Sequence, residues 1–178
     1  MKESSFHIIT SRELNAQDLT ALVTENKKYW EDFFPLTVRK NSTLKSSLLF
    51  LIEIQLNEQT RELFLFGMRD TISKELCGLL YLKNIDWDIK EAEVAYAISQ
   101  EYSGKGWTTQ AVHTISKEAF EMGLETLHII CHKTNAESVG VALKSNYIWQ
   151  KTLPNEFSHP KGDTLDMELY TLSKPNYD

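Results

Sequence analysis

The chain has 178 residues, 42% of them hydrophobic and 25% charged, which is enough for one globular domain with a substantial core and short for two. Its 19 Lys and Arg residues and 25 Asp and Glu residues give a formal net charge of −6. The basic residues are scattered, so no basic stripe indicates nucleic-acid binding. The mild acidity suits a cationic partner, although solubility alone explains it as well. We therefore predict one domain over residues 1–178 and no nucleic-acid partner.

The sequence shows no targeting or membrane-spanning pattern. Residues 1–6 lack the basic start and following apolar run of a secretory signal, and the most apolar stretch, Leu48–Ile54, is interrupted by Glu53 and far shorter than the ~20 residues that span a bilayer. We therefore expect a cytoplasmic protein without a membrane partner. Cys77 and Cys131 fall in apolar runs and are expected to be buried, reduced thiols.

The N-terminal third of the sequence predicts a short strand and two helices. Residues 6–10 read as the strand, and Asn15 is a suitable N-cap for a helix that continues to Lys28. A second helix is predicted at about 43–57, although its dense apolar run would also fit a strand. The apolar residues of this second helix that we expect to face the core are Leu44, Leu48, Leu51 and Ile52.

Residues 62–98 predict an antiparallel meander of three strands, because the runs Leu63–Met68, Leu76–Ile85 and Glu91–Ile98 are separated by short polar segments. A helix is then predicted from about Thr109 to Met122, with Gly123 as its C-terminal stop. The remaining predicted elements are a strand at 126–132, a helix at 136–145, and strands at 148–152 and 164–173 around a polar loop. The whole pattern indicates an α/β (α+β) fold.

The segment between the third of these strands and the next helix is suited to binding phosphate. Gly104 and Gly106 allow close approach of the backbone, and the N–H groups and dipole at a helix start attract anions. Taken alone, an ordinary strand-to-helix turn explains this segment better. It has neither the Walker A spacing nor the third glycine of the dinucleotide fingerprint.

Several features in a fixed order make the segment more specific. Residues 93–109 (EVAYAISQEYSGKGWTT), followed by Asn135–Ser138 (NAES) and Lys144–Tyr147 (KSNY), resemble the GNAT acetyltransferases, and more narrowly the RimJ/RimL-type branch of ribosomal-protein N-terminal acetyltransferases. Residues 26–35 are similar, more loosely, to the acceptor-side segment of that branch. The resemblance implies a mostly antiparallel sheet of six or seven strands, with a splayed central parallel pair and helices on both faces.

The resemblance also implies where coenzyme A binds. The family motif Gln/Arg-x-x-Gly-x-Gly/Ala falls on residues 103–108, where Ser103 replaces Gln or Arg and Thr108 replaces the small final residue. Because main-chain donors hold the pyrophosphate, these departures bear on affinity more than on identity. Lys105 either adds a charge beside the phosphates or is a solvated turn residue. The implied coenzyme-binding residues are Tyr96, Ala97, Ile98, Ser103, Gly104, Lys105, Gly106, Trp107, Thr108, Thr109, Asn135, Ser138 and Tyr147.

The strand at 91–98 has one face of small residues. Glu93, Ala95 and Ala97 share that face, which leaves space for a ligand. The resemblance implies that this strand splays from residues 126–132, so that freed backbone groups at 96–98 bind the pantetheine arm and polarise the acetyl carbonyl. The alternative is an ordinary edge strand with a covered alanine face.

The predicted catalytic residues are Glu93 and Ser138. Amide formation from an ammonium requires removal of a proton, and Glu93 is the best carboxylate for this step, although it would equally fit a strand glutamate paired with a lysine. In many family members, a tyrosine acts as the general acid at the position where this chain has Ala142. Ser138 is the nearest hydroxyl of the motif that remains. Asn135 is expected both to cap its helix and to contact pantetheine. Tyr147 is expected to pack near the coenzyme rather than to react.

Other candidate sites are weaker. His128 and His132 are four residues apart on a predicted strand, so no metal is predicted. The aromatic group at 29–34 fits an acceptor pocket or core packing equally well. No Gly-x-Ser-x-Gly elbow indicates a hydrolase.

The sequence therefore predicts an acetyl-CoA-dependent N-acetyltransferase that transfers acetyl directly to a primary amine in a ternary complex. A protein N-terminus is one acceptor. The alternatives are a small-molecule amine or antibiotic acetyltransferase, and a coenzyme A-binding sensor without turnover. We expect a monomer or a homodimer.

Overall fold

The computed structural model describes residues 5–159 and 162–175. Within them, seven strands are hydrogen-bonded in the order β1-β2-β3-β4-β5-β7-β6. The pairs β1–β2, β5–β7 and β6–β7 are antiparallel, whereas β4–β5 is parallel. The predicted fold class, with six or seven strands and one parallel pair, is therefore confirmed.

The chain divides into two compact units. Unit 1 comprises Met1–Tyr81 and Tyr96–Trp107, and unit 2 comprises Leu82–Ala95 and Thr108–Asp178. Two strands, β3 (Leu76–Asp86) and β4 (Glu91–Ile98), contribute to both units.

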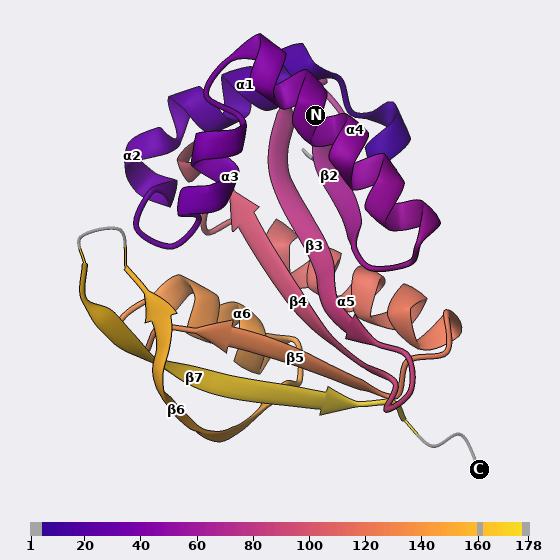
Figure 1. Cartoon of the computed structure of the whole chain (residues 1–178), viewed down its shortest axis with the longest axis vertical. Helices are drawn as coiled ribbons and strands as arrows, with labels where there is room; N and C mark the ends of the chain where they lie inside the picture. The colour runs from indigo at the N-terminus through magenta and orange to yellow at the C-terminus, as the bar shows by residue number, and fades with distance from the viewer. Residues whose placement is uncertain (1–4, 160–161, 176–178) are drawn as a thin grey trace. The chain divides into compact units, whose positions relative to one another are not determined.

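Unit 1 contains the N-terminal strands and four helices (Figure 1). Its elements in chain order are β1 (Phe6–Thr10), η1 (Ser11–Glu13), α1 (Ala16–Glu25), α2 (Lys27–Trp30), α3 (Pro35–Lys40), α4 (Leu44–Gln59), β2 (Phe64–Asp70), the first part of β3, the end of β4 and η2 (Gln100–Tyr102). Helices α1 and α4 lie side by side, and Thr20 of α1 donates a hydrogen bond to Ser47 of α4 over 2.8 Å. Both predicted helix starts are confirmed, because Asn15 accepts from the Asp18 N–H and Thr43 accepts from the Ser46 N–H.

The first helix ends earlier than predicted, at Glu25 rather than Lys28. Asn26 adopts a non-helical backbone conformation (φ −100°, ψ 7°), and its side-chain amide donates to the Leu22 carbonyl over 2.9 Å. Because the side chain uses a carbonyl of the last turn, the chain changes direction there and α2 begins as a separate short helix.

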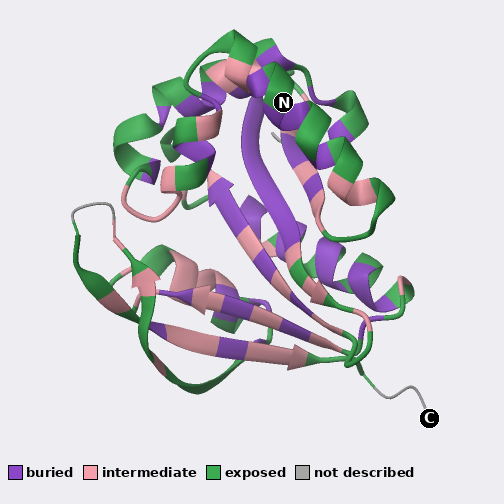
Figure 2. Ribbon diagram, in the orientation of Figure 1, coloured by how far each residue is buried: buried purple, intermediate pink, exposed green. Residues whose placement is uncertain are grey.

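The predicted core face of α4 is largely wrong. Of the four residues expected inside, only Leu51 is buried, and the other three are about half exposed. Figure 2 shows a buried and an exposed side along this helix. The residues that α4 buries are Ser47, Phe50, Leu51 and Ile54. Apolar residues occur almost all round the helix, so its periodicity did not distinguish the inner from the outer face.

Unit 2 contains the end of β3, the start of β4, α5 (Trp107–Glu121), β5 (Thr126–Cys131), α6 (Ala136–Lys144), β6 (Ile148–Ser158) and β7 (Thr164–Ser173). The helix α5 begins two residues before the predicted Thr109, and Gly123 follows its end with φ 106°. Strand β6 is longer than the predicted 148–152, because two register irregularities let it follow β7 to Ser158. The predicted polar loop at 152–163 is shorter accordingly.

Both cysteines are buried and free, as predicted. Burial raises the pKa of Cys77 to about 12 and also raises the pKa of Cys131, so both thiols stay protonated and unreactive at neutral pH. Among the helices of the described residues, none combines the length and the apolar character needed to span a membrane.

Replacement of glycine by alanine should have opposite effects on stability at two positions, Gly67 and Gly140. A Cβ at Gly67 would lie 2.8–2.9 Å from side-chain carbons of Leu14, Ile9 and Leu76, whereas a Cβ at Gly140, inside α6, would meet no atom within 4 Å. We expect Gly67→Ala to lower the free energy of unfolding by about 1–3 kcal/mol through overpacking. Gly140→Ala should raise it by about 0.5–1 kcal/mol through helix propensity. Urea unfolding of both variants tests this, and an unchanged midpoint for Gly67→Ala would contradict it.

Candidate functional site

The glycine turn has the backbone geometry that close approach of an anion requires. Gly104 and Gly106 both have φ of 77°, and a Cβ at either position would meet no other atom within 4 Å. The turn follows Ser103, which closes η2, and leads directly into α5 at Trp107. Left-handed backbone conformation therefore demands glycine at both positions, and the surface beside them is open. The start of α5 adds unpaired N–H groups in the same segment.

The side chain of Lys105 lies over two aromatic rings. Its ammonium is 4.2 Å from the ring centroid of Tyr102 and 5.2 Å from that of Trp107. The two rings are themselves 5.3 Å apart, and the Tyr102 hydroxyl donates to the Glu75 carboxylate over 3.0 Å. Cation–π attraction thus holds a positive charge next to the glycines. The side chain of Lys105 is exposed, so a charge beside phosphates stays a prediction, as does the alternative of a solvated turn lysine.

Strand β4 leaves its parallel partner early. Its register with β5 runs from the pair Glu91–Thr126 to the pair Glu93–His128 and includes three pairs. Residues 94 and 95 continue β4 within unit 2 beyond the last of these pairs. Within unit 2, the parallel register therefore ends at the pair Glu93–His128, two residues before the β4 segment of that unit ends.

In unit 1, Asn26 and Trp30 form hydrogen bonds with the end of β4 and the η2 segment that follows it. The indole of Trp30 donates to the Ile98 carbonyl over 3.0 Å, and the Asn26 side chain accepts from the Gln100 N–H over 2.9 Å. The Ser99 N–H donates to the Cys77 carbonyl of β3 over 2.7 Å. One backbone group predicted to serve the coenzyme, the Ile98 carbonyl, therefore already has a donor.

Sequence reasoning missed Asn26 and did not separate the members of the aromatic group at 29–34. Trp30 is only 2% exposed and packs in the core, whereas Tyr29 is 40% exposed. A buried tryptophan needs a partner for its N–H, but the sequence does not reveal that this partner lies 68 residues further along the chain. The only local signal for Asn26 was its residue type, because asparagine favours the ends of helices over their interiors.

In unit 2, Glu93 has two polar partners. Its carboxylate is 2.9 Å from the Lys83 ammonium and accepts from the Asn84 side-chain amide over 2.8 Å. The side chain of Glu93 is only 12% exposed. These contacts correspond to the predicted alternative of a strand glutamate paired with a lysine. They also fix the carboxylate on the small face of β4, where a base was expected.

The start of α6 contains two of the predicted residues. Asn135 accepts from the Ser138 N–H over 3.1 Å and caps the helix, as predicted. The Ser138 side chain forms a hydrogen bond with Cys131, which partly opposes the rise in the pKa of that thiol caused by burial. A motif hydroxyl is therefore present at the first turn of α6, at the end of β5.

Further along α6, Ala142 is fully buried, so a tyrosine there has no space without repacking. Tyr147 is also buried, and its hydroxyl forms a 2.8 Å hydrogen bond with the buried Ser116 hydroxyl. Burial raises the pKa of Tyr147. This tyrosine is a packing residue rather than an exposed proton donor, in line with the sequence-based expectation that it does not react.

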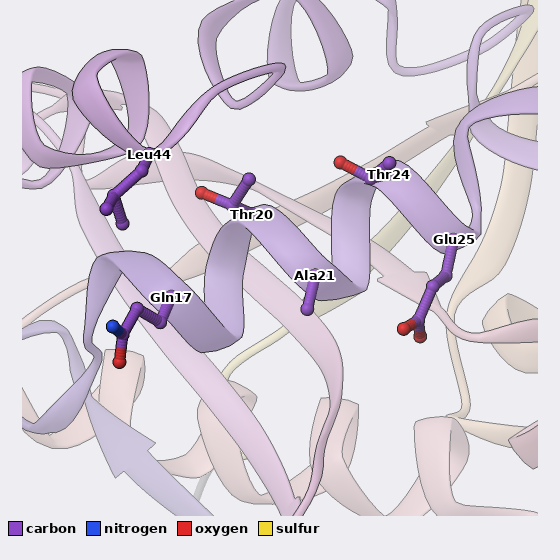
Figure 3. Close-up of a pocket in the computed structure, with 6 residues that line it drawn as sticks. All are labelled: Gln17, Thr20, Ala21, Thr24, Glu25 and Leu44. Carbon is purple, nitrogen blue, oxygen red and sulfur yellow. The ribbon is translucent and has the colours of Figure 1, made fainter.

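No group of three His, Cys, Asp or Glu side chains suited to a metal ion occurs in residues 5–159 and 162–175. The ring nitrogens of His128 are 3.1 Å from Glu91 and 3.0 Å from Thr171. A groove of about 390 Å³ lies instead on unit 1, between α1 and the start of α4 (Figure 3). Its lining residues are Gln17, Thr20, Ala21, Thr24, Glu25 and Leu44, none of which was predicted to act in the site.

The predicted site residues divide between the two units. Unit 1 holds Tyr96, Ala97, Ile98 and Ser103–Trp107, and unit 2 holds Glu93, Thr108, Thr109, Asn135, Ser138 and Tyr147. The glycine turn and the start of α5 are continuous in the chain, so the residues predicted to bind phosphate form one uninterrupted segment, 103–109. A parallel strand pair and a glycine turn that leads straight into a helix are the features of this α/β fold that suit anion binding.

The family model of the acetyltransferase (GNAT) domain matches residues 9–147, and the chain belongs to this family. The predicted family is therefore confirmed. YdaF of Bacillus subtilis, whose name assigns it provisionally to the ribosomal N-acetyltransferases, is 28% identical over 104 residues, which are 58% of this chain. The matched region spans 56% of that relative, little more than half its length.

Two solved structures show the same fold. The ribosomal-protein-S5-alanine acetyltransferase of Vibrio fischeri matches with a TM-score of 0.87 and 17% identity, covering 100% of this chain and 97% of that one. The microcin C7 self-immunity acetyltransferase MccE, solved with acetyl-CoA and AMP, matches with a TM-score of 0.83 and 19% identity, covering 98% and 94%.

Proposed function

We propose that this protein is an acetyl-CoA-dependent N-acetyltransferase that transfers acetyl directly to a primary amine, with a protein N-terminus as the acceptor class. The observation that carries the proposal is the pair of open glycines at φ 77° leading into a helix, inside the family-matched region. The names of the Bacillus and Vibrio relatives support the choice of acceptor. A single domain over residues 1–178 and a cytoplasmic location remain predictions and are part of the proposal.

The residues present fit the coenzyme. Main-chain N–H groups at 104–109 would hold its pyrophosphate, the ordered ammonium of Lys105 would add a positive charge, and Asn135 would meet the pantetheine arm. The coenzyme supplies the activated acetyl thioester. Open space beside both glycines is the feature that a backbone contact with phosphate needs.

The remaining chemistry is two proton movements. The acceptor amine must lose a proton before it attacks, and Glu93 is the carboxylate placed for that step, directly or through water. The departing sulfur needs only modest help, since a thiol has a reference pKa of ~8.5. A hydrogen bond from the Ser138 hydroxyl would provide that help in place of the missing tyrosine.

A second candidate function is a coenzyme A-binding sensor without turnover. The ion pair between Glu93 and Lys83 favours it, because this carboxylate already has a partner that accounts for its position on the strand. Release of free thiol from acetyl-CoA in the presence of N-terminal peptides and small amines distinguishes the two functions. A sensor would bind the coenzyme and release none, and turnover of small amines alone would indicate the small-molecule alternative.

Gly106→Val should sharply weaken coenzyme A binding while leaving the fold intact. The substitution forces a β-branched residue into φ 77° and puts carbon atoms into the open space where phosphate approaches. Calorimetric titration with coenzyme A measures the affinity, and circular dichroism checks the fold. Wild-type affinity in a folded Gly106→Val protein would remove the main support for the coenzyme site.

Glu93→Gln should lower turnover at neutral pH and recover part of it at alkaline pH, where the acceptor amine loses its proton without help. Acetyl-CoA affinity should change little. Glu91→Gln is the matched control, because Glu91 lies two residues earlier on the same strand and pairs with His128. If both variants keep the wild-type pH–rate profile, Glu93 has only the structural role of binding Lys83.

Ser138→Ala should lower turnover by about ten-fold or less, which is the effect of losing one hydrogen bond of about 1 kcal/mol to a developing charge. Coenzyme A affinity should stay the same, because the Ser138 N–H still bonds to Asn135. Steady-state kinetics and calorimetry measure the two effects separately. Complete loss of activity with normal binding and melting temperature would show that Ser138 is an obligatory acid.

A further inference from the structure

An apolar row runs along the exposed side of α4. Leu44, Leu48, Ile52 and Leu56 follow one another at a spacing of four residues, with Leu49 beside them. Each of these five side chains is 46–59% exposed, and together they are called the α4 stripe. The helix buries its other side against its own unit, so it is apolar on two opposite sides. An isolated exposed leucine needs no explanation, but a contiguous row of five indicates a missing partner.

The charges around the stripe argue against two kinds of partner. Membrane-surface helices carry several basic residues beside the apolar face, whereas the exposed side of α4 carries Lys45 and Glu53 of opposite sign. The chain as a whole has a net charge of −6. An anionic lipid surface, or a protein face that carries charges of one sign, would therefore gain little electrostatic attraction here.

A second copy of the same helix fits these charges. Related by a two-fold axis that crosses the stripe between Leu48 and Ile52, two antiparallel α4 helices place Leu44 of each chain beside Leu56 of the other. The same operation brings Lys45 of each chain toward Glu53 of the other. Glu53 is bound to Lys40 of its own chain over 2.6 Å, and its side chain is still 49% exposed, so it has space for a second ammonium.

The area of the stripe also matches a homodimer. Five large apolar side chains that are half exposed present on the order of 500 Å² of apolar surface, within the ~300–600 Å² of patches that are often functional. Homodimer interfaces of standard size bury about 800 Å² per partner, about 65% of it apolar, which again is on the order of 500 Å².

The groove between α1 and α4 lies at one end of the stripe, because Leu44 belongs to both (Figure 3). The hydrogen bond between Thr20 and Ser47 holds the two helices that form it. In the two-fold arrangement, Leu56 of the second copy arrives beside Leu44 and therefore beside this groove, which gives the end of the stripe a concave surface to fill.

We infer that the α4 stripe is a homodimer interface, in which two antiparallel α4 helices pack about a two-fold axis between Leu48 and Ile52. The acetyl-transfer chemistry does not enter this contact. A chain that is active but monomeric would overturn the dimer and leave the proposed function standing, and an inactive dimer would do the reverse.

Sedimentation velocity over a wide range of protein concentration tests the interface. The wild-type chain should dimerise, and Leu48→Glu with Ile52→Glu should weaken the dimer by at least ~100-fold, because four like charges then meet at the axis. The melting temperature should hardly change, since both side chains are exposed in the monomer. Ile72→Glu is the matched control, because Ile72 is 58% exposed outside the stripe. A wild-type monomer, or a dimer that survives both charges, overturns the inference.

Cysteine cross-linking tests the antiparallel register. Leu44→Cys and Leu56→Cys in one chain are ~18 Å apart along the helix, too far for an intrachain disulfide, but they lie side by side across the axis. Oxidation should give a covalent dimer with both substitutions and none with Leu44→Cys alone. The native Cys77 and Cys131 are buried and do not interfere. A dimer that does not cross-link would overturn the register.

Discussion

The hydrogen bonds that replace sheet pairing at the end of β4 are the interactions on which the candidate site depends. Every backbone N–H and C=O that leaves a sheet must find another partner or water. At the end of β4, the Ile98 carbonyl accepts from the indole of Trp30, and just beyond the strand the Gln100 N–H of η2 donates to the side chain of Asn26. Asn26 and Trp30 thus hold the end of β4 and the η2 segment that follows it, and they are available to do so because α1 ends at Glu25.

Sequence reasoning succeeded where the determining interaction is local. The caps at Asn15 and Thr43, the strand β4 and the glycine turn all follow from residue types within a few positions. For Glu93, the sequence predicted a lysine partner as one alternative but did not identify Lys83. The bond between Trp30 and Ile98 was not anticipated, because it joins residues that the fold alone brings together.

The errors in α4 and β6 have a different origin. In α4, apolar residues on both sides give a periodicity that fits two orientations, and only packing against α1 and β2 selects the inner one. In β6, the residues after Thr152 were predicted to form a polar loop, but the irregular register with β7 accommodates Pro154 and Asn155 inside the strand. Tertiary contacts override local preference in both cases.

The departures from the family's coenzyme motif have limited consequences because of where the side chains lie. Thr108 is buried in the first turn of α5, so its side chain packs inward and leaves the N–H groups of the helix start unchanged. Ser103 has extended backbone at the end of η2, before the two glycines. In the proposed function, main-chain donors recognise the coenzyme, and these depend on φ at Gly104 and Gly106 and on the start of α5. The proposal therefore expects side-chain changes at Ser103 and Thr108 to be tolerated, and replacement of the glycines to weaken binding.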